Sequence, residues 1–204
     1  MHNNLLVEGG MPVNQAEKVM ILLHGRGGSA RDIISLAERF NVENFYIVAP
    51  QATNNSWYPY SFLAPEEQNE PWLSSAVEVV KKLIDEISLV TGTENIYIMG
   101  FSQGACLALE TASRYAVNYA GVIGFTGGLI GNSVNPANYS GNFNATKVFI
   151  GNSDNDPHVP VDRSVQTKVI MESLGANVRL NIYPGMAHTI IKDEIETVSA
   201  WMNL

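Results

Sequence analysis

The stretch IYIMGFSQGACLAL (residues 96–109) decides the fold. A continuous apolar run over residues 96–99 ends in the pentapeptide GFSQG, and small apolar residues follow at once. Continuous apolar runs of this length are typical of strands that are buried on both faces. The stretch therefore predicts a buried strand that gives way to a helix, with the lone serine Ser102 held between two glycines in the connecting turn.

Apolar runs bounded by turn residues recur along the chain and predict five further strands, at residues 19–23, 46–49, 119–125, 148–150 and 178–183. Segments with helical spacing lie between them. The clearest begins at Pro71, a residue suited to a first helical turn, and Gly92 supplies its C-terminal cap. The last helix presents an apolar face made by Ile191, Ile195, Val198 and Met202. Strands that alternate with helices predict an α/β fold with a mostly parallel sheet covered on both faces.

The chain is expected to form one domain over residues 1–204. Its length suits a single α/β domain with a substantial core, and no internal repeat or low-complexity tract divides it. Two segments, at residues 51–69 and 127–144, are long for loops of a compact domain. We therefore expect these loops to form the rim of a binding site.

The charge balance and the cysteine count exclude several classes of function. The chain has 20 acidic and 12 basic residues and a net charge of −8, with a mean hydropathy of +0.01. Nucleic acid and membrane surfaces are not expected as partners, because there is no basic stripe. No apolar run approaches the roughly 20 residues that cross a bilayer, and no secretory pattern opens the chain, so a cytoplasmic protein is expected. The single cysteine, Cys106, excludes an intramolecular disulfide or a thiolate metal cluster.

The turn that holds Ser102 has the pattern G-x-S-x-G, which presents a strained, exposed serine at the end of a strand. A serine hydroxyl is a poor nucleophile at neutral pH and needs a base within hydrogen-bonding reach, oriented by a carboxylate. The chain offers four histidines, which are His2, His24, His158 and His188. The order serine, acid, histidine, with the histidine in the loop after the last strand, favours His188. The alternative for His188 is a histidine that starts a helix and has no chemical role.

The acid that would orient this histidine lies in the segment NSDNDPHVPV, which follows the predicted strand near residue 150. Asp154 and Asp156 both come after that strand in the right chain order. Either one also suits a turn or a cap, which is a common use of aspartate. The residues alone leave the choice between Asp154 and Asp156 open.

The segment HGRGG (residues 24–28) follows the first predicted strand and offers backbone donors. Attack on an ester carbonyl makes an oxyanion, which preorganised N–H groups stabilise by roughly 3 kcal/mol per donor. The N–H groups of Arg26 and Gln103 are the two candidates. Phosphate binding is the competing interpretation, but the spacing of a P-loop or a dinucleotide-binding turn is absent. His24 is then expected to be a structural residue that bonds within the loop.

Candidate substrate-binding residues lie in the segment NNSWYPYSFLAP and close to the predicted histidine base. Trp57 and Tyr58 belong to an aromatic cluster that suits an acyl or aryl group. Met186 is expected to line the same site. Core packing is the alternative for the aromatic side chains, and Cys106 is expected to be a buried packing thiol.

Four motifs occur in the order LHGRGG, GFSQG, DPHVP and GMAH. Together they resemble the phospholipase/carboxylesterase family of α/β-hydrolases, which includes bacterial carboxylesterases and acyl-protein thioesterases. The resemblance runs from Val19 to the C-terminus and is nearer to the bacterial esterases. It implies the α/β-hydrolase fold without the large lid of lipases, and a serine hydrolase with a Ser-Asp-His triad.

The motifs of this family also imply roles for individual residues. Ser102 is implied as the nucleophile and His188 as the base. Asp156 matches the pattern D-x-x-V-P, whereas Asp154 does not, so the resemblance implies Asp156 as the acid.

The oxyanion donors of the family correspond to the backbone of Arg26 and Gln103. In this family the residue that corresponds to Arg26 is commonly aliphatic. Arg26 instead carries a charge, which is expected to meet polar or anionic substrates. The resemblance implies a carboxylesterase without a metal or organic cofactor, and the expected partners are a small ester substrate and a second copy in a homodimer. The alternatives are an acyl-protein thioesterase or lysophospholipase, and a non-catalytic binding protein on a hydrolase scaffold.

Overall fold

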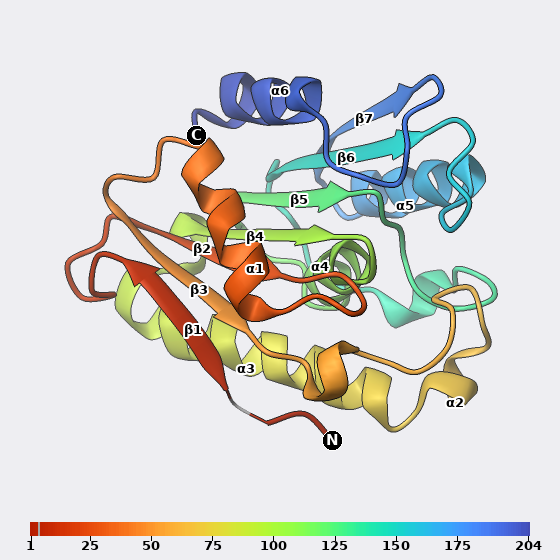
Figure 1. The fold of residues 1–204 in the computed structure, drawn as a ribbon, viewed down its shortest axis with the longest axis horizontal. Coiled ribbons are helices and arrows are strands. Elements are labelled where there is room, and N and C mark those ends of the chain that lie inside the picture. Colours follow the sequence, from red (N-terminus) through yellow and green to blue (C-terminus); the bar gives the residue numbers. More distant parts are fainter. Residues whose placement is uncertain (4) are drawn as a thin grey trace.

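The computed structural model describes residues 1–3 and 5–204, which form a seven-stranded sheet with helices against both faces (Figure 1). The strands are β1 (Leu6–Gly10), β2 (Lys18–Leu23), β3 (Phe45–Pro50), β4 (Ile96–Phe101), β5 (Gly121–Phe125), β6 (Lys147–Ser153) and β7 (Asn177–Tyr183). The α-helices are α1 (Ala30–Ile34), α2 (Glu66–Asn69), α3 (Trp72–Thr91), α4 (Gln103–Arg114), α5 (Val161–Ser173) and α6 (Lys192–Met202). Short 3-10 helices cover Ser35–Arg39, Thr53–Asn55, Thr93–Asn95 and Pro136–Asn138.

The strands lie in the order β1-β3-β2-β4-β5-β6-β7, and neighbouring strands are parallel except for β1 and β3. The predicted α/β fold with a mostly parallel sheet is therefore confirmed, and strands β2 to β7 correspond to the six predicted strands. The sequence does not predict β1. Its residues, LVEGG, contain only two apolar side chains, and glycine is disfavoured in strands.

The central strands divide their side chains between two cores. In β2, Val19, Ile21 and Leu23 pack with residues of α3, α4 and α5. Met20 and Leu22 face the other side, where α1 and α6 cover the sheet. All five side chains are fully buried. Burial on both faces explains why the strand sequences are continuously apolar rather than alternating.

The loops that follow the parallel strands gather at one edge of the sheet, on the right of Figure 1. Ser102 follows β4, Asp156 follows β6 and His188 follows β7. The glycine-rich segment at residues 24–28 follows β2, and the long loop at residues 51–69 follows β3. In open parallel sheets, ligands bind at the carboxyl ends of the strands. The topology alone thus brings the predicted site residues to the edge where a ligand is expected.

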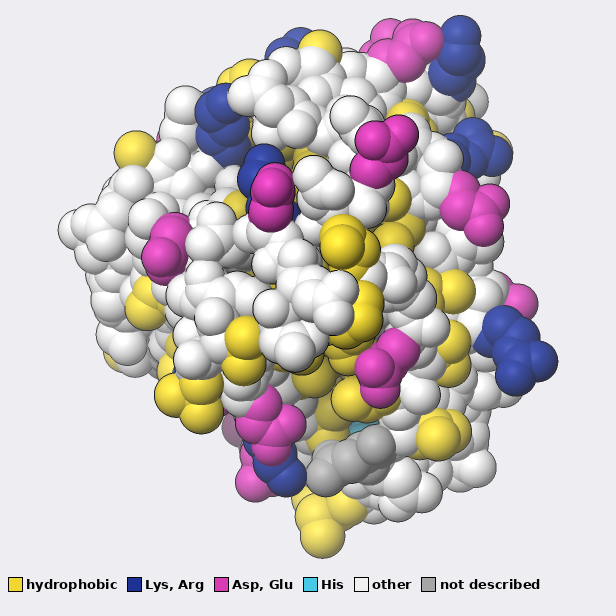
Figure 2. Space-filling view, turned by 90° about the vertical axis from the view of Figure 1, so that its left-hand side faces the viewer, with side chains coloured by type: hydrophobic (Ala, Val, Ile, Leu, Met, Phe, Trp, Pro, Cys, Tyr) yellow, Lys and Arg dark blue, Asp and Glu magenta, His cyan; other side chains and the backbone are white. Residues whose placement is uncertain are grey.

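Figure 2 shows the left-hand side of Figure 1, where the amino ends of the central strands lie. Lys and Arg side chains are interspersed with Asp and Glu side chains over this face. Mixed charge of this kind is typical of a solvated surface. None of the helices in the described part of the chain combines the length and the apolar character needed to cross a membrane.

Two glycines bring the turn between β4 and α4 into direct contact with β2. A Cβ at Gly104 would collide with the backbone of Leu23 and His24. A Cβ at Gly100 would collide with the carbonyl group of Gly104. Helix α4 can therefore begin against the end of β2 only because both positions lack a side chain, and this contact places Ser102 beside the glycine-rich segment.

We expect Gly104→Ala to lower the free energy of unfolding by about 3 kcal/mol, because the added methyl group must push α4 away from the backbone of β2. Gly9→Ala is the matched control, since a Cβ at Gly9 would make only an ordinary contact, 3.6 Å from Ile34 Cδ1. Its effect should stay below about 1 kcal/mol. Urea denaturation followed by circular dichroism measures both values, and equal effects would contradict the proposed importance of the contact between α4 and β2.

Candidate active site

Ser102 occupies a strained backbone conformation at the start of α4. Its φ is 54° and its ψ is −118°, and such a conformation costs on the order of 1–3 kcal/mol. The N–H of Ser102 donates to the carbonyl of Phe125 at 2.9 Å, and the Ser102 carbonyl accepts from the N–H of Cys106 at 3.0 Å. These two bonds attach the turn between β4 and α4 to the end of β5 and to the first turn of α4, with the serine at the strained position that the pattern G-x-S-x-G predicts.

One chain of hydrogen bonds joins Ser102, His188 and Asp156. His188 Nε2 lies 2.8 Å from Ser102 Oγ, and His188 Nδ1 lies 2.8 Å from Asp156 Oδ2. The side chain of Asp156 is fully buried, whereas that of His188 is 21% exposed. With Asp156 ionised, Nδ1 carries the ring proton and Nε2 is free to accept from the serine hydroxyl. The structure thus brings together three residues that the sequence places in separate motifs.

The structure separates the two aspartates that the sequence leaves as alternatives. Asp154 is exposed, and its Oδ1 accepts the N–H of Gly185 at 2.8 Å. This bond fixes the turn after β7, on the segment that leads to His188. Asp156 takes the place beside the imidazole.

Hydrogen bonds hold Asp156 in its ionised form. Burial alone would raise the pKa of this carboxyl, but the bond from His188 and the N–H groups of His158 and Val159 outweigh it and lower the pKa. Both N–H groups donate to Asp156 Oδ1 at 2.8 Å. Because the folded pKa lies below the unfolded one, the carboxylate contributes stability above the unfolded pKa, and this contribution is lost as the pH falls through the folded pKa. A negative charge therefore faces His188 at neutral pH.

Two aromatic rings pack against the imidazole of His188. The ring centroid of Phe101 lies 5.2 Å away, and that of His158 lies 4.8 Å away with the two rings at 78°. These contacts restrict the rotation of the imidazole. Within the described residues, no group of three His, Cys, Asp or Glu side chains is arranged to hold a metal ion.

The two predicted oxyanion donors lie on either side of the contact between α4 and β2. Gln103 is the first residue of α4, so its N–H has no acceptor within the helix. The N–H of Arg26 follows Gly25, at which a Cβ would lie 3.5 Å from Ser102 Cβ. Across residues 1–3 and 5–204, neither N–H donates a hydrogen bond to another protein group. Both can therefore donate to a ligand.

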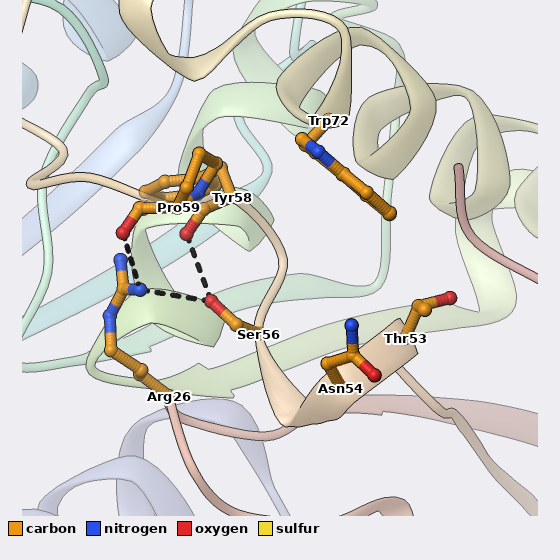
Figure 3. Close-up of a pocket in the computed structure, with 7 residues that line it drawn as sticks. All are labelled: Arg26, Thr53, Asn54, Ser56, Tyr58, Pro59 and Trp72. Atoms are coloured by element: carbon orange, nitrogen blue, oxygen red, sulfur yellow. Dashed lines mark hydrogen bonds between the residues drawn. The ribbon is translucent and has the colours of Figure 1, made fainter.

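The side chain of Arg26 binds the long loop after β3. Its guanidinium donates to Ser56 Oγ at 3.0 Å, to the Pro59 carbonyl at 2.9 Å and to the Tyr60 carbonyl at 2.6 Å. Figure 3 shows the bonds of Arg26 to Ser56 and Pro59. The guanidinium that was expected to meet substrates is thus hydrogen-bonded to the protein itself, and Arg26 also lines the cavity beside Ser102. No signal in the sequence indicates this role, because the partners lie 30 or more residues away.

The side chain of Gln103 binds the same loop from the buried side. Its Oε1 accepts the N–H of Trp57 at 2.9 Å, and its Nε2 donates to the carbonyl of Tyr58 at 2.9 Å. The side-chain amide of Gln103 therefore pairs with one N–H and one carbonyl of the loop backbone. Gln103 and Arg26 share this second role, which sequence reasoning does not find.

A cavity of about 690 Å³ opens beside Ser102. Its walls come from residues 58–63, from Gln103 and Cys106 on α4, from residues 157–159 and from His188. Much of this lining is apolar. Small-molecule sites commonly measure about 300 to 1,000 Å³ and have largely apolar walls with a few polar groups. The cavity therefore has the size and chemistry of a substrate site.

The predicted substrate-binding residues divide between this cavity and the core. Tyr58 lines the cavity. Trp57 is fully buried in the core, where its Nε1 donates to the His24 carbonyl at 2.9 Å. Met186 is buried and lies outside the cavity lining. Core packing, the alternative interpretation, thus describes Trp57. Cys106 is buried as expected, and burial raises the pKa of its thiol to about 12.

His24 and His2 hold the start of the long loop through ring nitrogens. Nε2 of His24 accepts the N–H of Ala52 at 3.1 Å, and Nδ1 donates to the Gly25 carbonyl at 2.8 Å. Nδ1 of His2 accepts the N–H of Thr53 at 3.1 Å. Burial lowers the pKa of both imidazoles. Both rings therefore have a structural role as neutral acceptors.

A buried carboxyl group lies behind the site, and sequence reasoning does not identify it. Glu194, in the first turn of α6, is fully buried, and its Oε2 accepts the N–H of Ile191 at 3.0 Å. Its Oε1 has no hydrogen-bond partner among the described residues and lies against Gly151 of β6. Burial raises the pKa of Glu194 to about 7. The side chain of Glu194 therefore lies between α6, which follows His188, and β6, which precedes Asp156.

Known proteins share this fold and much of this sequence. Residues 7–204 match the sequence profile of the family described as phospholipase/carboxylesterase. The crystal structure of a phospholipase/carboxylesterase from Dyadobacter fermentans is 48% identical, with a TM-score of 0.97 over 100% of this chain and 98% of that chain. Acyl-protein thioesterase 1 of Saccharomyces cerevisiae is 26% identical, with 93% of each chain covered. The Bacillus cereus carboxylesterase, at 22% identity, has a TM-score of 0.78 over 97% of this chain and 92% of that chain.

The architecture is that of an α/β-hydrolase, which confirms the predicted fold. The chain belongs to the phospholipase/carboxylesterase family. Membership of this family confirms the predicted class of enzyme, a carboxylesterase-type hydrolase.

We expect Glu194→Gln to remove the loss of stability that Glu194 causes as the pH rises. The folded pKa of about 7 lies above the ordinary value of 4.5, so the folded protein binds this proton more tightly than the unfolded chain does. Stability therefore falls as the pH rises between these values, by roughly 3 kcal/mol for a shift of this size. From about pH 5 to about pH 8, the free energy of unfolding of Glu194→Gln should change by a more positive amount than that of the wild type, because the variant lacks the loss that Glu194 causes. Equal differences in the two proteins would contradict the raised pKa.

Proposed function

We propose that this protein hydrolyses carboxylic esters of small or medium acyl or aryl groups, with Ser102 as the nucleophile. The observation that carries the proposal is the chain of hydrogen bonds from Ser102 through His188 to the buried Asp156, with both links at 2.8 Å. Such a chain activates a hydroxyl that is otherwise a poor nucleophile at neutral pH. Membership of the family supports the same chemistry.

In the first half of the reaction, Nε2 of His188 takes the proton of Ser102 while Oγ attacks the ester carbonyl. The N–H groups of Arg26 and Gln103 stabilise the resulting oxyanion, and loss of one such donor costs about 3 kcal/mol. Asp156 stays ionised and stabilises the imidazolium of His188. The imidazolium then gives its proton to the leaving alcohol, and the acyl group remains on Oγ.

In the second half, water takes the place of the alcohol. His188 accepts a proton from this water, whose oxygen attacks the carbonyl carbon of the acyl-enzyme. The tetrahedral intermediate collapses as Ser102 Oγ leaves and regains its proton from His188. The carboxylic acid departs, and the free enzyme is restored.

The dimensions of the cavity support small and medium substrates. Its volume of about 690 Å³ includes the space that both the acyl group and the leaving group must occupy. Tyr58, Phe62 and Val159 line it and are almost completely buried, so they give it a partly apolar wall. Such walls favour acyl and aryl groups over charged ones.

Asp156→Asn and Asp154→Asn form a matched pair. We expect Asp156→Asn to lower kcat for p-nitrophenyl acetate by about 10³- to 10⁴-fold, because an amide favours the wrong tautomer of His188 and does not stabilise its positive charge. Asp154→Asn keeps an oxygen that can accept the N–H of Gly185, so its kcat should stay within about threefold of the wild type. Ser102→Ala, which lacks the proposed nucleophile, gives the background rate of the assay. Loss of activity in Asp154→Asn alone would refute Asp156 as the acid.

A series of p-nitrophenyl esters from acetate to palmitate, together with the corresponding thioesters, tests the substrate class. We expect the highest kcat/KM for short and medium oxygen esters, because a cavity of about 690 Å³ must hold both the acyl group and the leaving group. A preference for long-chain thioesters would instead favour the activity that the name of the yeast relative describes. A wild type that neither turns over any of these compounds nor reacts with a fluorophosphonate would favour a binding protein on a hydrolase scaffold.

A further inference from the structure

The guanidinium of Arg26 makes contacts that the proposed mechanism does not use. It has three acceptors on one short segment, which are Ser56 Oγ, the Pro59 carbonyl and the Tyr60 carbonyl. The planar arrangement of its donors suits several acceptors at once, and less freedom is lost per bond than with a flexible lysine. One side chain therefore fixes residues 56–60 relative to the peptide of residue 26.

The segment that carries the Arg26 peptide needs such support. Gly25, Gly27 and Gly28 surround Arg26, and glycine has the most backbone freedom of all residues. The φ of Gly27 is +78°, and its N–H donates to the Asn55 carbonyl at 2.7 Å. The glycine-rich segment is thus attached to the long loop by its backbone at Gly27 and by the guanidinium at Arg26.

The same contacts shape the substrate cavity. Arg26, Tyr58 and Pro59 line both the cavity beside Ser102 and a second cavity of about 280 Å³, which is drawn in Figure 3. The other residues around the second cavity are Thr53, Asn54, Ser56 and Trp72. Arg26 and its loop partners therefore form part of the wall between the two cavities. The guanidinium is thus one of the groups that hold this wall in place, together with the side chain of Gln103.

We propose that Arg26 is a positioning residue of the active site, whose side chain holds its own peptide N–H at the place of the oxyanion and the loop wall at residues 58–60 beside Ser102. This inference rests on the proposed function. The guanidinium itself does not touch the reacting atoms. It acts through the glycine-rich segment on one side and through the loop on the other.

Gln103 provides an independent observation that supports this proposal. Its N–H is the other proposed oxyanion donor, and its side chain binds Trp57 and Tyr58 in the same loop. Both donors are therefore carried by residues whose side chains hold residues 56–60. The loop and the oxyanion site form one hydrogen-bonded unit, so a change in the loop is expected to alter the positions of both N–H groups.

The test compares Arg26→Ala, Arg26→Lys and the control Arg179→Ala, whose exposed side chain lies on β7 away from the cavity. We expect Arg26→Ala to lower kcat for p-nitrophenyl acetate by about 10- to 100-fold with a smaller change in KM, because a peptide N–H remains but is no longer held. Arg26→Lys should recover part of the loss, and Arg179→Ala should stay within about threefold of the wild type.

Two further readouts distinguish positioning from general damage. A trifluoromethyl ketone forms a hemiketal oxyanion on the serine, so its Ki should rise in Arg26→Ala by the same factor by which kcat/KM falls. The Ki of 1-butanol, a neutral alcohol that carries no negative oxygen, should change by less than about threefold. Added guanidinium ion should restore part of the activity of Arg26→Ala and have no such effect on Arg179→Ala.

Full activity of Arg26→Ala, or equal weakening of the ketone and 1-butanol, would overturn the proposal. A failure of Arg26→Ala to fold would leave Arg26→Lys as the test, and an unchanged ketone Ki with reduced kcat in that variant would also overturn it. The proposed function fails separately, if Ser102→Ala keeps the activity of the wild type. An active, serine-dependent enzyme that is insensitive to Arg26→Ala would refute only the role of Arg26.

Discussion

The close contact between the first turn of α4 and the end of β2 is the constraint on which the site depends. Gly104 lies against the backbone of Leu23, so the GFSQG turn and the HGRGG segment meet with no side chain between them. The strained φ of Ser102 is the local cost of this approach. Its benefit is that Ser102, Arg26 and Gln103 line the same cavity. A bulkier residue at position 104 would separate them.

Two buried carboxyl groups near the site show how hydrogen-bond partners determine whether a carboxyl group is ionised. Asp156 receives hydrogen bonds from one ring nitrogen and two backbone N–H groups, and its pKa is lowered in spite of burial. Glu194 receives one backbone N–H, and burial raises its pKa to about 7. The same chemical group is thus held charged in front of His188 and close to neutral behind β6. The number of donors that each carboxylate meets accounts for the difference.

The sequence predicts those parts of the fold and site that depend on chain order and spacing. The buried strands, the serine turn and a histidine after the last strand all have local patterns, and the structure places Ser102 and His188 within hydrogen-bonding distance. Asp154 and Asp156 have the same chemistry and nearly the same place in the chain, so the residues alone do not separate them; the family motif implies Asp156, and the structure places Asp156 beside His188. Trp57 and Tyr58 are neighbours, yet only Tyr58 lines the cavity.

The contacts that hold the long loop are beyond sequence reasoning for the same reason. Arg26, Gln103 and His24 each reach partners that lie 28 or more residues away. No periodicity or motif spacing records such a contact. The short edge strand β1 is likewise defined by its pairing with β3 rather than by a pattern of its own.

The neutral imidazoles of His2 and His24 make the attachment of the long loop sensitive to acid. Each ring accepts a backbone N–H of the loop, from Thr53 and Ala52, and each can do so only while that nitrogen carries no proton. Their pKa values are lowered by burial, so the unfolded chain binds these protons more tightly and the attachment weakens as the pH falls below the ordinary value. The strands of the sheet contain no histidine, so protonation of these two rings removes hydrogen bonds from the start of the long loop and none from the sheet.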